Sequence, residues 1–267
     1  MNSLKTSAVD TVTHAPIATV DRFCRDVFAA IGADEATADA ATRAMMHGSR
    51  IGVDSHGVRL LDHYVKVMEA GRVNKQPNVR VVQSFGAVAS LDTDNGHGAL
   101  GAYRAMEHAV ELADRFGIGA VSIRNSSHFG PAGAYAMAAA ARGFAGLAVC
   151  NSDSFVRLHD GAMRFHGTNP IAFAVPVAGD HPWLLDMATS AIPYNRVQLY
   201  RSLGVELPQG VASDTAGHDT RDPELVEMLA PVGGEFGFKG AGLAGFAEIL
   251  SAVFSGMKLS FDILPMN

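Results

Sequence analysis

The stretch DNGHGALGAY, residues Asp94–Tyr103, decides which kind of α/β fold the sequence predicts. Within it, Gly96, Gly98 and Gly101 have the GxGxxG spacing of a Rossmann turn, where a dinucleotide pyrophosphate rests on a helix N-terminus. A second copy of the spacing lies in FKGAGLAG, residues 238–245. The chain contains 28 glycines, so the spacing can also arise by chance. The residues on either side of each copy must therefore show whether it is a Rossmann turn.

A Rossmann turn follows a buried parallel strand, and the next strand ends in an acid that binds the ribose. Here the preceding segment AVASLDTDN, residues 87–95, is polar on both faces of a strand. The strand after the helix ends at Arg124 and Asn125, where an acid is required, although an arginine could still suit a 2′-phosphate. The second copy follows PVGGEFGF, residues 231–238, which is a glycine-rich loop. We interpret both copies as glycine turns that open helices.

Hydrophobic periodicity divides the chain near residue 75. The segment 1–75 is dominated by helical periodicity, with Phe23 and Phe28 on one predicted helix face and Asp34 as the N-cap of the next helix. In the segment 76–267, short β-like runs alternate with helices. We therefore predict a helical unit followed by an α/β domain. The predicted strands are residues 79–84, 87–93, 120–125, 144–152, 171–176 and 183–188.

Composition and charge exclude several classes of protein. With 267 residues, 48% hydrophobic and 18% charged, the chain can bury one large core or two modest ones. With a net charge of -6 and no run of basic residues, the sequence does not predict a basic surface that binds nucleic acid or an anionic membrane. Cys24 and Cys150 lie far apart, so we expect no disulfide framework and a reducing cytoplasm. The N-terminus is polar and the longest apolar run is broken by Arg142 and Gly143, so we expect no membrane span.

Two histidine motifs are candidates for chemistry. VDSHGVRLLDHY places His56 close to Arg59, and SIRNSSHFGPAGAY places His128 at the end of a predicted strand. A histidine beside glycine can reach a ligand, and near neutral pH it can exchange the proton that accompanies hydride transfer to a carbonyl. The alternative is structural: one histidine caps a helix C-terminus and the other is hydrogen-bonded in the core. Taken singly, either motif fits both interpretations.

The order of the motifs favours the functional interpretation. DSHGVRL, DNGHG, SSHFGPAG, CNSDS, HGTNPIAFAVP, LDMATS and GFKGAGLA follow one another over most of the chain. Together they resemble the malate/L-lactate dehydrogenase family without a Rossmann fold, which includes ureidoglycolate dehydrogenases, diketogulonate reductases, sulfolactate dehydrogenases and piperideine-2-carboxylate reductases. The resemblance runs from about Val20 to Met266. It implies an α+β fold, with a helical substrate-side and dimerisation unit and an unusual, largely antiparallel α/β domain that binds NAD(P).

The same resemblance implies roles for individual residues. His56 and His128 match the family histidines of which one carries the proton, and we expect His128 to do so, while Asp186 completes the catalytic set. Ser55 and Arg59 are implied on the substrate side. The implied cofactor contacts are Ser152, Thr168, Asn169, Asp186, Met187, Ala188, Lys239 and Gly240. The alternatives are purely structural: GTNPIAFAVP is a turn before a buried strand, and LDMATS is a strand followed by an N-cap.

Two departures from the family pattern affect this transfer. In many relatives an arginine stands four residues after the SHG histidine, whereas here Arg59 is three residues after it and Leu60 takes the usual place. One helical position rotates a side chain by about 100°, so Arg59 need not clamp a substrate carboxylate. Relatives also continue beyond SFDILPMN, so we expect the C-terminal part of the NAD(P)-binding domain to be shortened.

The sequence thus predicts a cytoplasmic, homodimeric NAD- or NADP-dependent oxidoreductase of a small 2-hydroxy or 2-oxo acid such as malate or lactate. One alternative is a reductase of a cyclic imino acid such as piperideine-2-carboxylate. The other is a shortened, non-catalytic protein that binds a nucleotide or a partner. No metal is expected.

Overall fold

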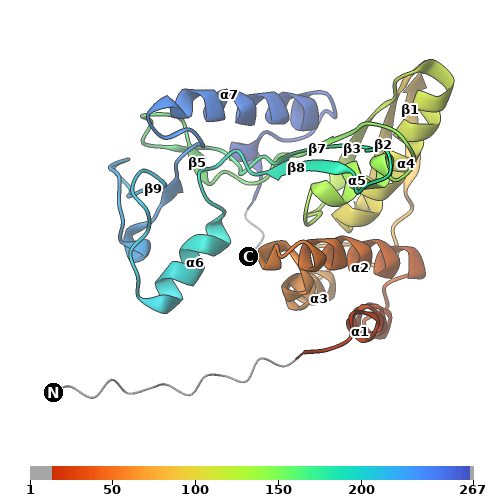
Figure 1. Ribbon diagram of the computed structural model, residues 1–267, viewed down its shortest axis with the longest axis horizontal. Coiled ribbons are helices and arrows are strands. Elements are labelled where there is room, and N and C mark those ends of the chain that lie inside the picture. The colour runs from red at the N-terminus through yellow and green to blue at the C-terminus, as the bar shows by residue number, and fades with distance from the viewer. Residues whose placement is uncertain (1–13, 265–267) are drawn as a thin grey trace.

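The computed structural model describes residues 14–264 and begins with three helices (Figure 1). They are α1 (Ile17–Ala30), α2 (Glu35–Arg50) and α3 (Leu61–Glu69). The Asp34 side chain accepts a hydrogen bond from the Thr37 backbone N–H at 2.7 Å, which confirms the predicted N-cap of α2. The predicted inward position of Phe23 is wrong, since Phe23 is 59% exposed while Cys24 and Phe28 are buried. The buried pair is one turn apart, and Phe23 is turned about 100° away from it.

The first sheet has the order β1-β2-β3, and its middle strand leads into the first GxGxxG stretch. β1 (Arg80–Phe85) pairs antiparallel with β2 (Val88–Gly96), and β2 pairs in parallel with β3 (Ala120–Ser126). The helix α4 (Gly98–Phe116) connects β2 to β3 and packs on them. Small side chains let α2 approach the start of α4, so the N-terminal helices reach the end of β3.

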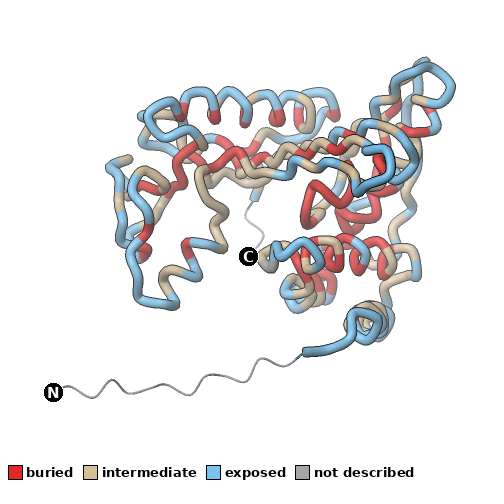
Figure 2. Tube along the Cα trace, in the orientation of Figure 1, coloured by how far each residue is buried: buried red, intermediate tan, exposed pale blue. Residues whose placement is uncertain are grey.

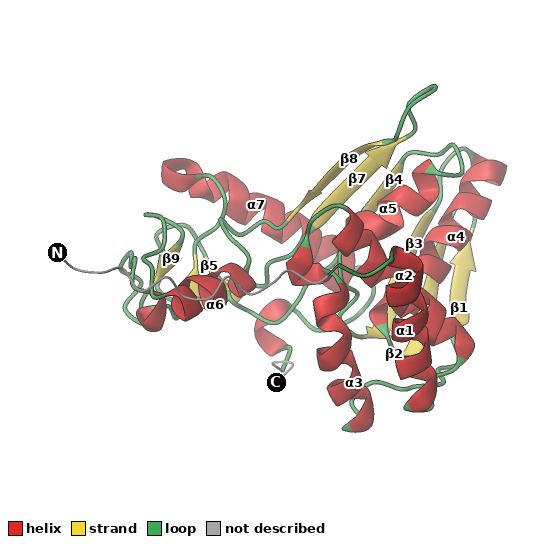
Figure 3. Cartoon of the chain, turned by 60° about the horizontal axis from the view of Figure 1, so that its bottom comes forward, coloured by secondary structure: helices red, strands yellow, loops and turns green. Residues whose placement is uncertain are grey.

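The second sheet places several predicted site residues at one edge. β4 (Gly146–Val149), β7 (Ile171–Val175) and β8 (Trp183–Met187) are antiparallel neighbours and lie side by side in Figure 3. Val149, Ile171 and Met187 share one register position. The segments after β4, before β7 and after β8 therefore meet at the same edge. The short helix α5 (Gly133–Ala140) covers one face through alanine contacts.

The rest of the chain forms a third sheet and two helices that the sequence did not reveal as a unit. The strands β5 (Val156–Arg157), β6 (Arg164–His166), β9 (Ala212–Ser213) and β10 (Met228–Leu229) have the order β6-β5-β10-β9. The helix α6 (Tyr194–Leu203) contributes Val197 to the core beside them. The helix α7 (Gly237–Glu248) continues as a π-helical turn, Ile249–Val253, and its outward side is exposed (Figures 1 and 2).

Each of the predicted strands is present, and most strand pairings are antiparallel. Within residues 14–264, parallel pairing occurs at β2–β3 and β5–β10. The mixed helix and sheet fold with mainly antiparallel pairing is thus confirmed. The division of the chain near residue 75 stays a prediction.

One helical stretch bears on the expectation about membranes. Gly234–Val253 is 20 residues long with a hydropathy of 1.2, enough by length and composition to cross a membrane. A single stretch of this kind is weak support for a span, because core helices of water-soluble proteins share the pattern. Glu248 lies inside the stretch, buried and hydrogen-bonded to other segments.

Candidate active site

The two histidine motifs meet beyond the end of β3. His128 follows β3, and His56 lies in a short 3₁₀ turn, Asp54–His56, after α2. The two imidazole rings are stacked, with centroids 5.9 Å apart and an interplanar angle of 29°. Tyr64 on α3 places its Oη 2.9 Å from His128 Nδ1. Two neighbouring segments, the turn after α2 and α3, thus build one cluster with the distant His128.

Burial and mutual proximity keep the histidines of this cluster neutral. Burial, followed by the nearby His56, His97 and His63, lowers the pKa of His128 to about 3. Burial alone lowers the pKa of His56. Burial also raises the pKa of Tyr64 well above its ordinary value, so its hydroxyl stays protonated. At neutral pH the cluster therefore offers an uncharged imidazole beside a phenol.

This arrangement suits proton exchange in either direction. The Tyr64 hydroxyl can donate to His128 Nδ1, which leaves a proton on Nε2, or it can accept from Nδ1–H, which leaves Nε2 as a base. An anionic ligand nearby would favour the protonated imidazole and raise its pKa. His128 can thus serve as proton donor or acceptor once a carboxylate binds.

The GxGxxG stretch packs beside this cluster. His97 is buried and caps α4, since its Nδ1 accepts from the Ala99 backbone N–H at 3.1 Å. The Gly98 N–H donates to Ser127 Oγ at 3.2 Å. A Cβ on Gly98 would collide with the carbonyl oxygen of Ser127, so glycine is required for close packing. The first N–H groups of α4 are therefore bonded within the protein.

The predicted substrate-side residues take different positions. Ser55 Oγ lies 2.9 Å from His56 Nδ1, and the Ser55 carbonyl accepts from Asn195 Nδ2 at 3.3 Å. Ser55 is therefore part of the cluster. Arg59 is exposed in the turn Val58–Leu60, whereas Leu60 packs against the core of the N-terminal helices. Within residues 14–264, no hydrogen bond or ion pair joins Arg59 to the histidines.

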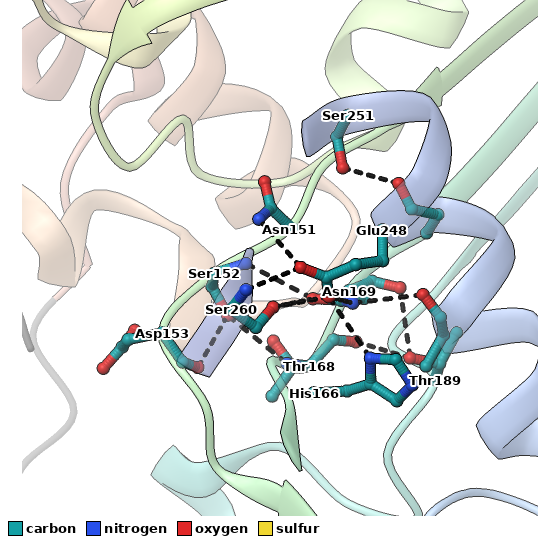
Figure 4. A network of polar contacts seen from close by, with 12 residues as sticks. Asn151, Ser152, Asp153, His166, Thr168, Asn169, Thr189, Glu248, Ser251 and Ser260 are labelled. Atoms are coloured by element: carbon teal, nitrogen blue, oxygen red, sulfur yellow. Dashed lines mark hydrogen bonds and ion pairs between the residues drawn. The ribbon is translucent and has the colours of Figure 1, made fainter. Parts of the chain in front are cut away.

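Ser152, Thr168 and Asn169 lie together at the edge of the second sheet (Figure 4). The Thr168 N–H donates to Ser152 Oγ, and the Ser152 N–H donates to Asn169 Oδ1, both at 3.3 Å. Ser152 and Thr168 are partly accessible, while Asn169 is completely buried. The CNSDS and HGTNP motifs thus form one structural unit.

The LDMA motif ends β8 at the same edge. The Asp186 residue is exposed, but its carboxylate accepts the Gly133 N–H of α5 at 2.9 Å. Loss of water around the carboxylate raises its pKa, and the bond from Gly133 opposes that shift. Met187 and Ala188 are partly accessible beside it. Asp186 therefore connects this edge to the helix that follows the His128 motif.

Lys239 and Gly240 belong to α7, which begins at Gly237. The interpretation of the second GxGxxG copy as a helix-opening turn is therefore wrong, because its glycines lie within the helix. Gly240 is buried, and a Cβ there would collide with the Val232 carbonyl oxygen. The Val232 N–H donates to the Thr189 carbonyl at 2.9 Å, which ties this segment to the residue after Ala188. Lys239 is exposed and lies over the rings of Phe236 and Phe238.

Several residues of the site were not singled out from sequence. His63 and His97 surround the Tyr64–His128 pair, with the His97 ring edge-on to Tyr64 at 4.2 Å. Glu248 and His166 form a buried pair next to Asn169. The signal for Glu248 was a carboxylate inside an apolar helix, since a buried charge needs partners. Within residues 14–264, no group of three or more histidine, cysteine or acidic side chains could hold a metal ion.

The comparison with known sequences assigns the chain to a family. A sequence model of the family "Malate/L-lactate dehydrogenase" matches residues 15–267. The chain belongs to this family, which confirms the resemblance. The malate dehydrogenase of Pyrococcus abyssi is 41% identical over 223 residues, which cover 81% of this chain and 61% of that protein. The chain therefore spans about three fifths of the length of this relative.

Solved structures of related proteins have the same fold. The malate dehydrogenase from Entamoeba histolytica has a TM-score of 0.89 at 29% identity, covering 92% of this chain and 72% of that one. The delta1-piperideine-2-carboxylate reductase from Pseudomonas syringae has a TM-score of 0.88 at 28% identity, covering 95% and 76%.

Proposed function

We propose that this chain provides the site of an NAD(P)-dependent oxidoreductase, which transfers hydride between a nicotinamide and the C2 atom of a small 2-hydroxy or 2-oxo acid. The observation that carries the proposal is the stacked pair His56 and His128, with Tyr64 bonded to His128 Nδ1. Malate and oxaloacetate are the first substrates to test, because the Pyrococcus abyssi relative is a malate dehydrogenase.

The groups at the edge of the second sheet suit a dinucleotide. Ser152 is a partly accessible residue and Asp186 offers an acceptor, while Lys239 supplies an exposed cation for phosphate charge. These residues, with Thr168, Met187, Ala188 and Gly240, would hold NAD or NADP. Bound there, the nicotinamide ring supplies or accepts the hydride.

The residues of the chain supply the proton and the positioning. His128 moves the proton at Nε2 to or from the substrate oxygen, and Tyr64 fixes the ring by holding Nδ1. His56, held by Ser55, presents a second imidazole toward the substrate carboxylate. With the substrate anion beside it, the pKa of His128 rises toward the neutral range, which favours proton transfer.

A cyclic imino acid is the alternative substrate. The Pseudomonas syringae neighbour is a piperideine-2-carboxylate reductase with nearly the same TM-score as the malate dehydrogenase neighbour. A C=N bond at C2 needs the same hydride geometry, with the proton delivered to nitrogen. The exposed position of Arg59 favours neither substrate.

A test compares the activities directly. The purified protein, with its mass confirmed, is assayed by NADH and NADPH absorbance with oxaloacetate, pyruvate and piperideine-2-carboxylate. Turnover of an oxo acid supports the main proposal, and turnover of the imine alone supports the alternative. Cofactor binding without any turnover would instead favour a non-catalytic nucleotide-binding protein.

The assembly and location are further parts of the proposal. We expect a cytoplasmic homodimer that binds neither nucleic acid nor membrane. Free Cys24 and Cys150 support a reducing compartment. The outer face of the second sheet exposes Leu147, Trp183 and Leu185, which supports association with another surface. Light scattering after size exclusion tests the dimer.

A further inference from the structure

The carboxylate of Glu248 on α7 bonds to three other segments of the chain, at Asn151, at residues 166–169 and at Ser260. Its Oε1 accepts from the Ser260 N–H at 2.6 Å and from Asn151 Nδ2 at 3.2 Å. Its Oε2 accepts from Asn169 Nδ2 at 2.7 Å, Ser260 Oγ at 2.6 Å and His166 Nδ1 at 3.2 Å. The side chain is 8% exposed. Figure 4 shows these groups converging on Glu248 from both sides.

The partners of Glu248 require an ionised carboxylate. Burial alone would raise the pKa of Glu248, but the bonds from His166, Ser260 and Asn169 lower it to about 2. A carboxylate can only accept, so each neighbouring group must turn a donor toward it.

This requirement fixes the orientation of the Asn169 amide. Nδ2 faces Glu248 and the Ala244 carbonyl, at 2.7 and 3.1 Å, so Oδ1 faces the opposite way. There Oδ1 accepts the Ser152 N–H at 3.3 Å. Both ends of this buried amide are occupied by the protein, so its polar atoms are not free for a ligand.

The Ser152 segment is positioned tightly as a result. Ser152 Oγ accepts the Thr168 N–H, and a Cβ on Gly167 would collide with that oxygen. The orientation of Asn169 therefore determines whether the Ser152 backbone keeps its acceptor.

We propose that Glu248 is a positioning residue for the cofactor side of the site, acting through the Asn169 amide to hold the Ser152 backbone and hydroxyl in place. This inference rests on the proposed function for its consequence, because Ser152 is a cofactor contact only in that proposal. The hydrogen-bond relay itself belongs to the chain alone. Glu248→Gln preserves volume but turns a donor toward groups that are donors themselves.

The test measures backbone hydrogen exchange at Ser152 and Ser260 in the cofactor-free protein, together with NADH affinity by fluorescence titration. In Glu248→Gln, Nε2 faces Asn169 Nδ2 while Oε1 can keep the Ser260 N–H. We therefore expect exchange at Ser152 to rise about tenfold, as for loss of a hydrogen bond, exchange at Ser260 to change much less, and NADH affinity to fall. Glu69→Gln, at an exposed position on α3, is the matched charge control and should change neither. If wild-type protein does not bind NADH, the proposed function fails, while the exchange data still decide the relay.

Exchanging donor and acceptor gives the sharper result. In Glu248→Gln with Asn169→Asp, the Gln Nε2 takes the place of Oε2 and donates to the new carboxylate. The other carboxylate oxygen accepts the Ser152 N–H, so protection at Ser152 should partly return, while the Gln Oε1 keeps the Ser260 N–H bonded. If Glu248→Gln does not fold, Asn169→Ala serves, because it leaves Ser260 bonded and should release Ser152 alone. Wild-type exchange at Ser152 in either single variant, or no recovery in the double variant, would overturn the proposal.

Discussion

Tyr64 and His128, separated by 64 residues in the chain, meet through a hydrogen bond of 2.9 Å between Oη and Nδ1. Tyr64 is 1% exposed, and the His97 ring packs edge-on against it. The phenol is therefore fixed, and it fixes one nitrogen of His128 in turn. In the proposed function the other nitrogen, Nε2, exchanges the proton with the substrate.

Tyr64→Phe should separate this positioning role from packing. The substitution removes the hydroxyl and keeps the ring, so we expect little loss of melting temperature. Because the His128 ring loses its bond, turnover should fall about tenfold or more, in the range of a lost general-acid contribution. Steady-state kinetics with thermal denaturation measures both. Unchanged turnover would show that Tyr64 only fills space.

Gly98→Ala tests whether the GxGxxG stretch is a packing device. The added methyl would collide with the Ser127 carbonyl oxygen, so we expect a destabilisation of about 1–3 kcal/mol in the free energy of unfolding. Gly242→Ala is the matched control, because no atom lies within 4 Å of its added Cβ. Urea denaturation compares the two. A fully stable Gly98→Ala protein that loses only NAD(P)H binding would restore the Rossmann interpretation.

Asp186→Asn tests the acid at the end of β8. The amide can still accept the Gly133 N–H through its oxygen, so the fold should persist. Loss of the charge beside the proposed nicotinamide site should lower cofactor affinity and turnover. Asp180→Asn, exposed in the β7–β8 loop, is the control. Wild-type affinity and turnover in Asp186→Asn would remove this residue from the site.

Much of the fold followed from local patterns. Most strand runs apart from β2 are rich in apolar residues and bounded by turns, and Asp34 caps α2 as its position before an alanine-rich segment predicts. The stretch around Gly98 was correctly interpreted as a helix-opening turn, since the flanking strand is too polar for a Rossmann core. The third sheet was missed because strands such as Val156–Arg157 are too short to show periodicity.

The sequence predicted only part of the site, because the site depends on contacts between distant segments. His56 and His128 could be selected by motif, but their stacking depends on how the 3₁₀ turn and the end of β3 pack in space. In the sequence, Tyr64 is indistinguishable from the apolar residues of an amphipathic helix. Nothing local distinguishes Glu248 from a surface acid except the apolar run around it. Contacts across the chain cannot be derived from spacing within one element.

Glu248 should also be visible in the pH dependence of stability. Its folded-state pKa of about 2 lies below the ordinary 4.5, so its ionised form stabilises the fold above about pH 4.5. That contribution, about 3 kcal/mol from the size of the shift, should be lost as pH falls from about 4.5 toward 2. The difference in unfolding free energy between wild type and Glu248→Gln should therefore narrow on acidification. His166, which faces the carboxylate, is present in both proteins. A difference that stays constant with pH would contradict an ionised Glu248.

Steady-state kinetics of two variants can distinguish the proposed roles of His128 and His56. His128 lies beyond the end of β3 with Nδ1 held by Tyr64, whereas His56 is held by Ser55 in the turn after α2. Loss of a general acid or base typically costs a factor of about 10² to 10⁴ in turnover, while loss of a binding contact falls mainly on KM. His128→Ala should therefore collapse kcat with NAD(P)H binding retained, and His56→Ala should chiefly raise KM for the acid substrate. His108→Ala, far along α4 beside Glu111, is the control for loss of an imidazole. The reverse pattern in the two variants would assign the proton to His56 and the carboxylate contact to His128.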